Sequence, residues 1–112
     1  MTRTKVFISA RLRGDCIDSN IAKGVLYARN AYKNGYEPLV PIIYFPRFMS
    51  AGNDVEDSDG MQFCRNWIDL SDEVWVMDVN GISSGMAEEI EYANSIGKSI
   101  KYFSKNEIPI VV

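Results

Sequence analysis

The chain has 112 residues, 46% of them hydrophobic and 24% charged, which predicts a single soluble domain spanning residues 1–112. No apolar run reaches the ~20 residues of a membrane helix and no secretory leader precedes the first apolar segment, so we expect a cytoplasmic protein without membrane contact. The net charge of −3 argues against binding of duplex nucleic acid, and the absence of histidine excludes Ser-His and Cys-His catalytic pairs.

The two cysteines, Cys16 and Cys64, are widely separated and lack the paired spacing of a zinc site. In the reducing compartment expected here, both should be free thiols. We therefore expect neither a metal nor a cofactor, and any chemistry has to use carboxylates, tyrosine, lysine or arginine.

The beginning of the chain predicts a strand, a loop and a helix. Residues 5–10 are β-branched and aromatic enough for a buried strand, and residues 11–15 form the loop that leaves it. Asp18 or Ser19 can cap a helix with apolar residues at helical spacing, and an Asn-Gly pair at residues 34–35 ends it.

The middle of the chain predicts a second strand over residues 39–43, in which Pro41 indicates an edge position or a strand end. A long connection follows. Its polar, acidic part, residues 48–60, is expected to be partly mobile. Apolar residues at helical spacing mark a second helix over residues 61–70.

The last part predicts a central strand over residues 73–77, a helix from Ser84 to Gly97, a strand over residues 100–102 and a further strand over residues 108–112. Strands and helices that alternate in this way imply a parallel sheet covered on both faces. We therefore predict a three-layer, flavodoxin-like or Rossmann-like α/β fold with four or five strands in the order 2-1-3-4-5.

Three loops should meet at one edge of this sheet. Ligands of such sheets bind outside the carboxyl ends of the strands, where helix N-termini also point. Residues 9–14, 44–48 and 78–89 all leave strands at that end, so we expect them to line one cleft.

Glu89 is the main catalytic candidate. At about 100° per residue, Met86, Ile90 and Ala93 form an apolar stripe, with Glu89 beside it and Glu88 on the far side. A carboxylate at the edge of this stripe can act as a nucleophile. The alternative is an ordinary surface charge, because acidic residues are favoured in the first turn of any helix.

The same cleft offers an anion site, because hydroxyl groups, helix-start amides and guanidinium groups commonly bind phosphate. The residues expected to contact a substrate are Ser9, Arg11, Arg13, Gly14, Tyr44, Phe45, Ser83, Ser84 and Gly85. The serines at 83 and 84 can instead be helix caps, and the two arginines can be solvated loop charges. The aromatic residues can stack on a base or simply pack.

These residues resemble the nucleoside 2-deoxyribosyltransferase superfamily, which includes the 2'-deoxynucleoside 5'-phosphate N-hydrolases. Residues 6–14 resemble the family's first strand and glycine-containing loop, and residues 71–76 resemble the acidic start of its central strand. The strongest match is Ser83-x-Gly85-x3-Glu89-x2-Tyr92-Ala93. The resemblance extends from Lys5 to Tyr102 and is closest to short bacterial or phage-type members.

The resemblance implies that Glu89 attacks the anomeric carbon of a nucleoside or nucleotide and forms a glycosyl-enzyme, which water or a second base resolves. It also implies that Ser83, the helix-start amides and Arg13 hold a 5'-phosphate. A small-molecule nucleoside or nucleotide would then be the partner. The family habit further implies a homo-oligomer, a dimer or higher, with the site shared across subunits.

Two positions depart from the family pattern. Cys64 matches an aspartate that assists the leaving base, and Phe7 matches a tyrosine that contacts the nucleophile. Asp78 can stand in as the acid. These departures favour an alternative, a non-catalytic module that binds or sequesters a nucleotide on the same fold. A purely structural oligomer is a third reading.

Overall fold

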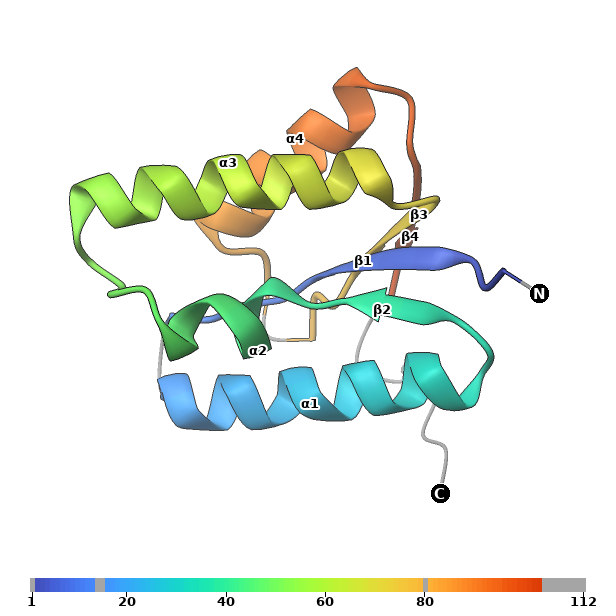
Figure 1. The fold of residues 1–112 in the computed structure, drawn as a ribbon, viewed down its shortest axis with the longest axis horizontal. Coiled ribbons are helices and arrows are strands. Elements are labelled where there is room, and N and C mark those ends of the chain that lie inside the picture. The colour runs from blue at the N-terminus through green and yellow to red at the C-terminus, as the bar shows by residue number, and fades with distance from the viewer. Residues whose placement is uncertain (1, 14–15, 80, 104–112) are drawn as a thin grey trace.

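Four parallel strands form one sheet in this structure, a computed structural model that describes residues 2–13, 16–79 and 81–103 (Figure 1). The strands are β1 (Lys5–Ser9), β2 (Glu37–Leu39), β3 (Glu73–Val76) and β4 (Ser99–Tyr102), in the order β2-β1-β3-β4. All neighbouring pairs are parallel. The predicted α/β fold and the order 2-1-3-4 are confirmed, and the strand expected over residues 108–112 lies outside the described residues.

Helices cover both faces of the sheet (Figure 1). The elements are α1 (Ile17–Lys33), α2 (Pro41–Tyr44), the 3-10 turn η1 (Phe45–Arg47), α3 (Asp54–Leu70) and α4 (Ser84–Ser95). Helices α1 and α2 lie on one face, and α3 and α4 lie on the other, which gives the predicted three layers. Within the described ranges, no helix has the length and hydrophobicity needed to cross a membrane.

The side chains of β1 alternate between the two faces of the sheet. Val6 and Ile8 pack in a core cluster that also contains Tyr27 of α1. Phe7 points the other way, into a cluster with Ile68 of α3. All three strand side chains are fully buried, as expected for a central strand of a parallel sheet. The period of two in β1 therefore supplies both cores.

The second strand is present, but its predicted bounds, residues 39–43, are wrong. Strand β2 ends at Leu39, and Pro41 opens the short helix α2. Proline suits the first position of a helix, because its fixed φ angle is helical and its missing N–H is not needed there. Ile42 is buried in a helical turn rather than in a strand.

Two helix starts also differ from the predictions. Helix α3 begins at Asp54, so residues 54–60, expected to belong to a mobile connection, form regular helix. The side chain of Asn53 caps this helix by accepting hydrogen bonds from two first-turn amides, and acidic residues in that turn suit its positive end. Helix α1 begins at Ile17 with Cys16 as its N-cap residue, which places Asp18 in the first turn instead of at the cap.

Gly24 allows α1 to approach α2 closely. A Cβ atom at Gly24 would lie 2.8 Å from side-chain atoms of both Ile42 and Ile43. We expect Gly24→Ala to lower the free energy of unfolding by about 1 kcal/mol, since overpacking costs about 1–3 kcal/mol and helix propensity returns up to ~1. Urea denaturation measures the change. The control is Gly60→Ala in α3, where only Met49 lies near, at 3.8 Å, and the variant should be more stable. Changes of the same sign in the two variants would contradict the close approach.

Candidate active site

Glu89 is buried in the second turn of α4. The hydroxyl of Ser83 caps this helix by accepting a hydrogen bond from the amide of Met86 at 3.3 Å. The buried residues of α4 are Met86, Glu89 and Ala93, at the predicted spacing of three and four. Glu89 is only 9% exposed, so its carboxylate is not a solvated surface charge.

Two neutral side chains bind the carboxylate of Glu89. The hydroxyl of Ser9, at the end of β1, donates a hydrogen bond to Glu89 Oε1 at 2.6 Å. The thiol of Cys64 on α3 forms a second side-chain hydrogen bond to Glu89. The carboxylate is thus fixed from three elements, β1, α3 and α4, that lie far apart in the sequence.

Burial controls the ionisation of this group. Desolvation raises the pKa of Glu89 to about 7, while the hydrogen bonds from Ser9 and Cys64 favour the charged form and oppose the rise. Burial and the neighbouring Glu89 raise the pKa of the Cys64 thiol, so the thiol stays protonated and acts as a donor. Near neutral pH, Glu89 exists in both its neutral and its charged form.

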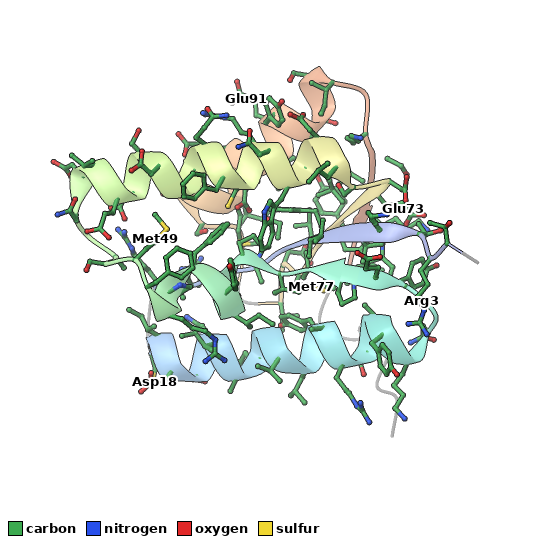
Figure 2. The ribbon with its side chains drawn as sticks, in the orientation of Figure 1. Arg3, Asp18, Met49, Glu73, Met77 and Glu91 are labelled. Carbon is green, nitrogen blue, oxygen red and sulfur yellow. The ribbon has the colours of Figure 1, made fainter. Side chains whose placement is uncertain are left out.

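Glu89 and Cys64 line a cavity of about 580 Å³, within the range typical of small-molecule sites. The cavity lies at the carboxyl end of the strands, between α3, the start of α4 and the loops after β1 and β2. Met49, which lines it, lies between α2 and α3 in Figure 2. Arg3 and Glu73, near the starts of β1 and β3, lie at the opposite end of the molecule (Figure 2).

The structure brings most of the predicted site residues together. The cavity is lined by Glu89, Arg13, Phe45, Ser83, Ser84 and Gly85. Ser9 joins the site through its hydrogen bond to Glu89 rather than through the cavity wall. Gly14 lies outside the described residues.

Besides Ser9, three predicted residues do not line this cavity: Arg11, Tyr44 and Asp78. Arg11 lines a separate hollow of about 10 Å³ together with Asn20 and Tyr27 of α1. Arg11 Nε and Asp78 Oδ1 are buried and find no hydrogen-bond partner among the described residues. Tyr44 stacks on Trp67 with ring centroids 5.7 Å apart and is half-exposed.

Arg13 reaches across the cavity to the first turns of α3. Its guanidinium forms an ion pair and hydrogen bond with Asp57 at 2.6 Å. This bond holds the pKa of Asp57 below its ordinary value. Asp57, in turn, accepts a hydrogen bond from the amide of Gly52 at 3.2 Å. The loop after β1 is thereby tied to the segment that precedes α3.

The resemblance placed Cys64 of α3 at the site, but the contribution of the first turns of α3 was not predicted. Asp57, Met61 and Cys64 recur with a spacing of four and three, so one face of α3 lines the cavity. The sequence contains the pattern of a helix start at this point, because Asn53 followed by acidic residues is typical of a helix N-terminus. Beginning the helix at Asn53 would have placed these residues on a common face.

Both cysteines are free thiols, as predicted. Across the described parts of the chain, no three cysteine, aspartate or glutamate side chains gather closely enough to hold a metal ion.

The fold and the buried carboxylate define a doubly wound parallel α/β domain with an acidic cavity at the carboxyl edge of its sheet. The chain belongs to the family described as Domain of unknown function (DUF7768), whose profile matches residues 4–103. No curated protein sequence matches the chain.

Solved structures of 2-deoxyribosyltransferases share this fold. The enzyme from the psychrotolerant bacterium Bacillus psychrosaccharolyticus matches with a TM-score of 0.69 and 15% identity, over 90% of this chain and 72% of that one. The enzyme from Leishmania mexicana matches with a TM-score of 0.53 and 17% identity, over 90% of this chain and 64% of that one. The chain therefore spans about two thirds of the length of these enzymes, and the resemblance predicted from the sequence is confirmed for the fold.

The raised pKa of Glu89 predicts a pH-dependent stability. The ordinary pKa of the glutamate carboxyl is 4.5, and in the folded protein it is about 7. Between these two pH values, Glu89 of the folded state holds a proton that the unfolded state has lost. The free energy of unfolding should therefore fall as pH rises through this window, by roughly 3 kcal/mol in total. The side chain in Glu89→Gln cannot ionise, so this variant should not show the decrease in the free energy of unfolding. Urea denaturation at about pH 5 and about pH 8 measures the decrease. The exposed neighbour Glu88, changed to Gln, should keep it, and parallel profiles for Glu89→Gln and wild type would contradict the burial.

The Ser9 hydroxyl should hold the pKa of Glu89 down. In Ser9→Ala the carboxylate loses a donor that stabilises its charged form, so the pKa of Glu89 should rise above about 7. The ¹³C shift of the labelled side-chain carboxyl carbon, followed against pH, reports this value. Ser71→Ala removes another buried hydroxyl, one that donates to the carbonyl of Ile68. This control variant should titrate with the same pKa of Glu89 as the wild-type protein. An equal or lower pKa in Ser9→Ala would remove Ser9 from the site.

Proposed function

We propose that the protein cleaves or transfers the N-glycosidic bond of a (deoxy)nucleoside or its 5'-monophosphate, with Glu89 as the nucleophile. The observation that carries this proposal is a buried, hydrogen-bonded carboxylate in the wall of a cavity of about 580 Å³. The fold shared with two 2-deoxyribosyltransferases supports the same chemistry.

In the first step, a carboxylate oxygen of Glu89 attacks the anomeric carbon, the bond to the base breaks, and a glycosyl ester forms on the enzyme. Water, in a hydrolase, or a second base, in a transferase, then attacks the same carbon and restores the carboxylate. Ser9 and Cys64 hold the carboxylate in place through their hydrogen bonds. Poor hydration in the buried site keeps the carboxylate basic, which favours nucleophilic attack.

The start of α4 supplies the proposed binding site for a 5'-phosphate. The Ser83 hydroxyl accepts from the amide of Met86, so its own proton remains available to a phosphate oxygen. The amides of Ser84 and Gly85 belong to the first turn of the helix, where backbone donors lack helical partners. Arg13 would turn part of its guanidinium from Asp57 to the phosphate.

Phe45 is the aromatic residue best placed to stack on the base, because it lines the cavity and packs against Trp67 with ring centroids 4.8 Å apart. Half-exposed Tyr44 and Phe48 extend this aromatic cluster to the surface. The exposed rings support the expectation of a homo-oligomer that covers the site from a second subunit. Both this assembly and a cytoplasmic location stay predictions.

A second candidate function is a non-catalytic module that binds or sequesters a nucleotide. It is favoured by one observation: both side chains hydrogen-bonded to Glu89 are neutral. Phe7, fully buried in the core, offers no hydroxyl to the site. On this alternative, the cavity and the start of α4 serve binding alone.

Release of free base separates the two functions. We expect the wild-type protein to release base from at least one member of a panel of ribo- and deoxyribonucleosides and their 5'-monophosphates, with neutral and N7-methylated bases, detected by chromatography. Glu89→Gln should lower the rate on the order of 10³-fold or more, because it removes the nucleophile. Glu88→Gln, which alters the adjacent exposed carboxylate, is the matched control.

Two outcomes would contradict glycosidic cleavage. Equal release by wild type and Glu89→Gln would show that Glu89 is not the nucleophile. Thermal stabilisation by a nucleotide that no variant cleaves would favour the binding module. A phosphate requirement that disappears in Ser83→Ala would support the phosphate site at α4.

A further inference from the structure

We propose, on the basis of the function proposed above, that the substrate is an N-glycoside whose leaving group is a positively charged heterocycle. A pyridinium nucleoside and an N7-alkylated purine nucleoside are the two chemical forms of this class. Such a ring departs as a neutral base and needs no proton from the protein. The inference rests on the groups that surround Glu89 and on the charges that line the cavity.

No group in contact with Glu89 is suited to protonate a leaving base. The contacts come from the Ser9 hydroxyl, at 2.6 Å, and from the Cys64 thiol. A hydroxyl is too weak an acid, and burial next to Glu89 makes the Cys64 thiol a weaker acid than an ordinary thiol. General acids work best when their pKa lies near the working pH.

The other carboxyl groups that line the cavity are bound to neighbouring groups or exposed. Asp57 forms an ion pair with Arg13 at 2.6 Å, and this contact holds its pKa low, in the charged form. Glu56 accepts a hydrogen bond from the amide of Ser50 at 3.0 Å. Glu88 is exposed at the surface of α4. Among the described residues that line the cavity, Glu89 is therefore the one buried carboxyl group, and the proposed function already uses it as the nucleophile.

The charges of the cavity favour a cationic ring. Four lining residues carry carboxyl groups and two carry guanidinium groups: Glu56, Asp57, Glu88 and Glu89, against Arg13 and Arg65. One of the two guanidinium groups is engaged by Asp57. Phe45 adds an aromatic face, which attracts cations through its π electrons. A positive ring would be held near the carboxylate in the ground state and would lose its charge as it leaves.

The reaction balances without an acid. A Glu89 carboxylate oxygen forms a bond to C1', and the electron pair of the C1'–N bond moves to the ring nitrogen and cancels its positive charge. The neutral base leaves. Water then attacks C1' of the glycosyl ester, the ester C1'–O bond breaks to restore the carboxylate, and the proton from water goes to solvent. A neutral purine would have to depart as an anion in the same site.

The test compares guanosine with 7-methylguanosine, which differ by one methyl group and its positive charge, and adds nicotinamide riboside as the pyridinium case. Base release is followed by chromatography, and the rate with Glu89→Gln is subtracted. We expect kcat/KM for both cationic substrates to exceed that for guanosine by at least about 100-fold, because general acid catalysis is worth about 10²–10⁴-fold. Values for guanosine within about tenfold of those for 7-methylguanosine would overturn the inference.

Variants at Cys64 test the cause of the preference. Cys64→Asp places a second carboxyl group beside Glu89. The new carboxyl group can hold a proton and donate it to a neutral leaving base, so the ratio of kcat/KM between the cationic substrates and guanosine should fall by at least about tenfold. Cys64→Ser keeps a neutral donor and should retain the ratio. If Cys64→Asp folds and the ratio stays the same, the missing acid does not explain the preference. If Cys64→Asp does not fold, the comparison of substrates with the wild-type protein alone tests the inference. Absence of Glu89-dependent release from these compounds and from every deoxynucleoside and 5'-monophosphate of the panel above would overturn the proposed function itself.

Discussion

The hydrogen bond between Ser9 and Glu89 joins strand β1 to helix α4, across a separation of 80 residues. It places a largely buried carboxylate beside the end of β1, in the wall of the cavity. Burial of an ionisable group disfavours its charged form, and only the hydroxyl of Ser9 and the thiol of Cys64 oppose that effect. The chemistry of the cavity depends on this balance.

The parallel sheet explains why these groups meet. In a parallel α/β fold, the carboxyl ends of the strands and the N-termini of the following helices lie at one edge. Ser9, the start of α4 and the turn after β2 reach that edge from separate parts of the chain. The ion pair between Arg13 and Asp57 then links the loop after β1 to α3 in the wall of the cavity. Each contact is local to the edge, although the residues are distant in sequence.

The sequence-based predictions succeeded where one local pattern decides the structure. Strands β1 and β3 and helix α4 follow from runs of buried residues and from helical spacing, and the burial of Glu89 follows from its place beside Met86. The predicted bounds of the second strand were wrong at Pro41, because a proline is typical both of a strand end and of a helix start.

The role of Cys64 could not be predicted from spacing alone. It depends on the register of α3 against α4, which tertiary packing sets. The same limit applies to Arg11 and Asp78. They leave strands at the expected edge, but Arg11 borders the hollow beside α1 and Asp78 is absent from the lining of the main cavity. Position along the sheet edge was predictable, and the face that each side chain occupies was not.

The burial of Glu89 is costly for a position with a purely structural role. Met86 and Ala93 fill the neighbouring positions of the same helical face with apolar side chains, and a neutral amide at Glu89 could keep hydrogen bonds to its neighbours without an ionisation penalty. A carboxylate with a pKa near 7 is useful where the group must become charged, attack and be released near neutral pH. Strongly shifted ionisable groups that face a cavity are concentrated at functional sites, whereas structural ion pairs bring their own counter-charge. Glu89 has no such counter-charge among its hydrogen-bond partners, Ser9 and Cys64, so its energetic cost is better explained by function than by folding.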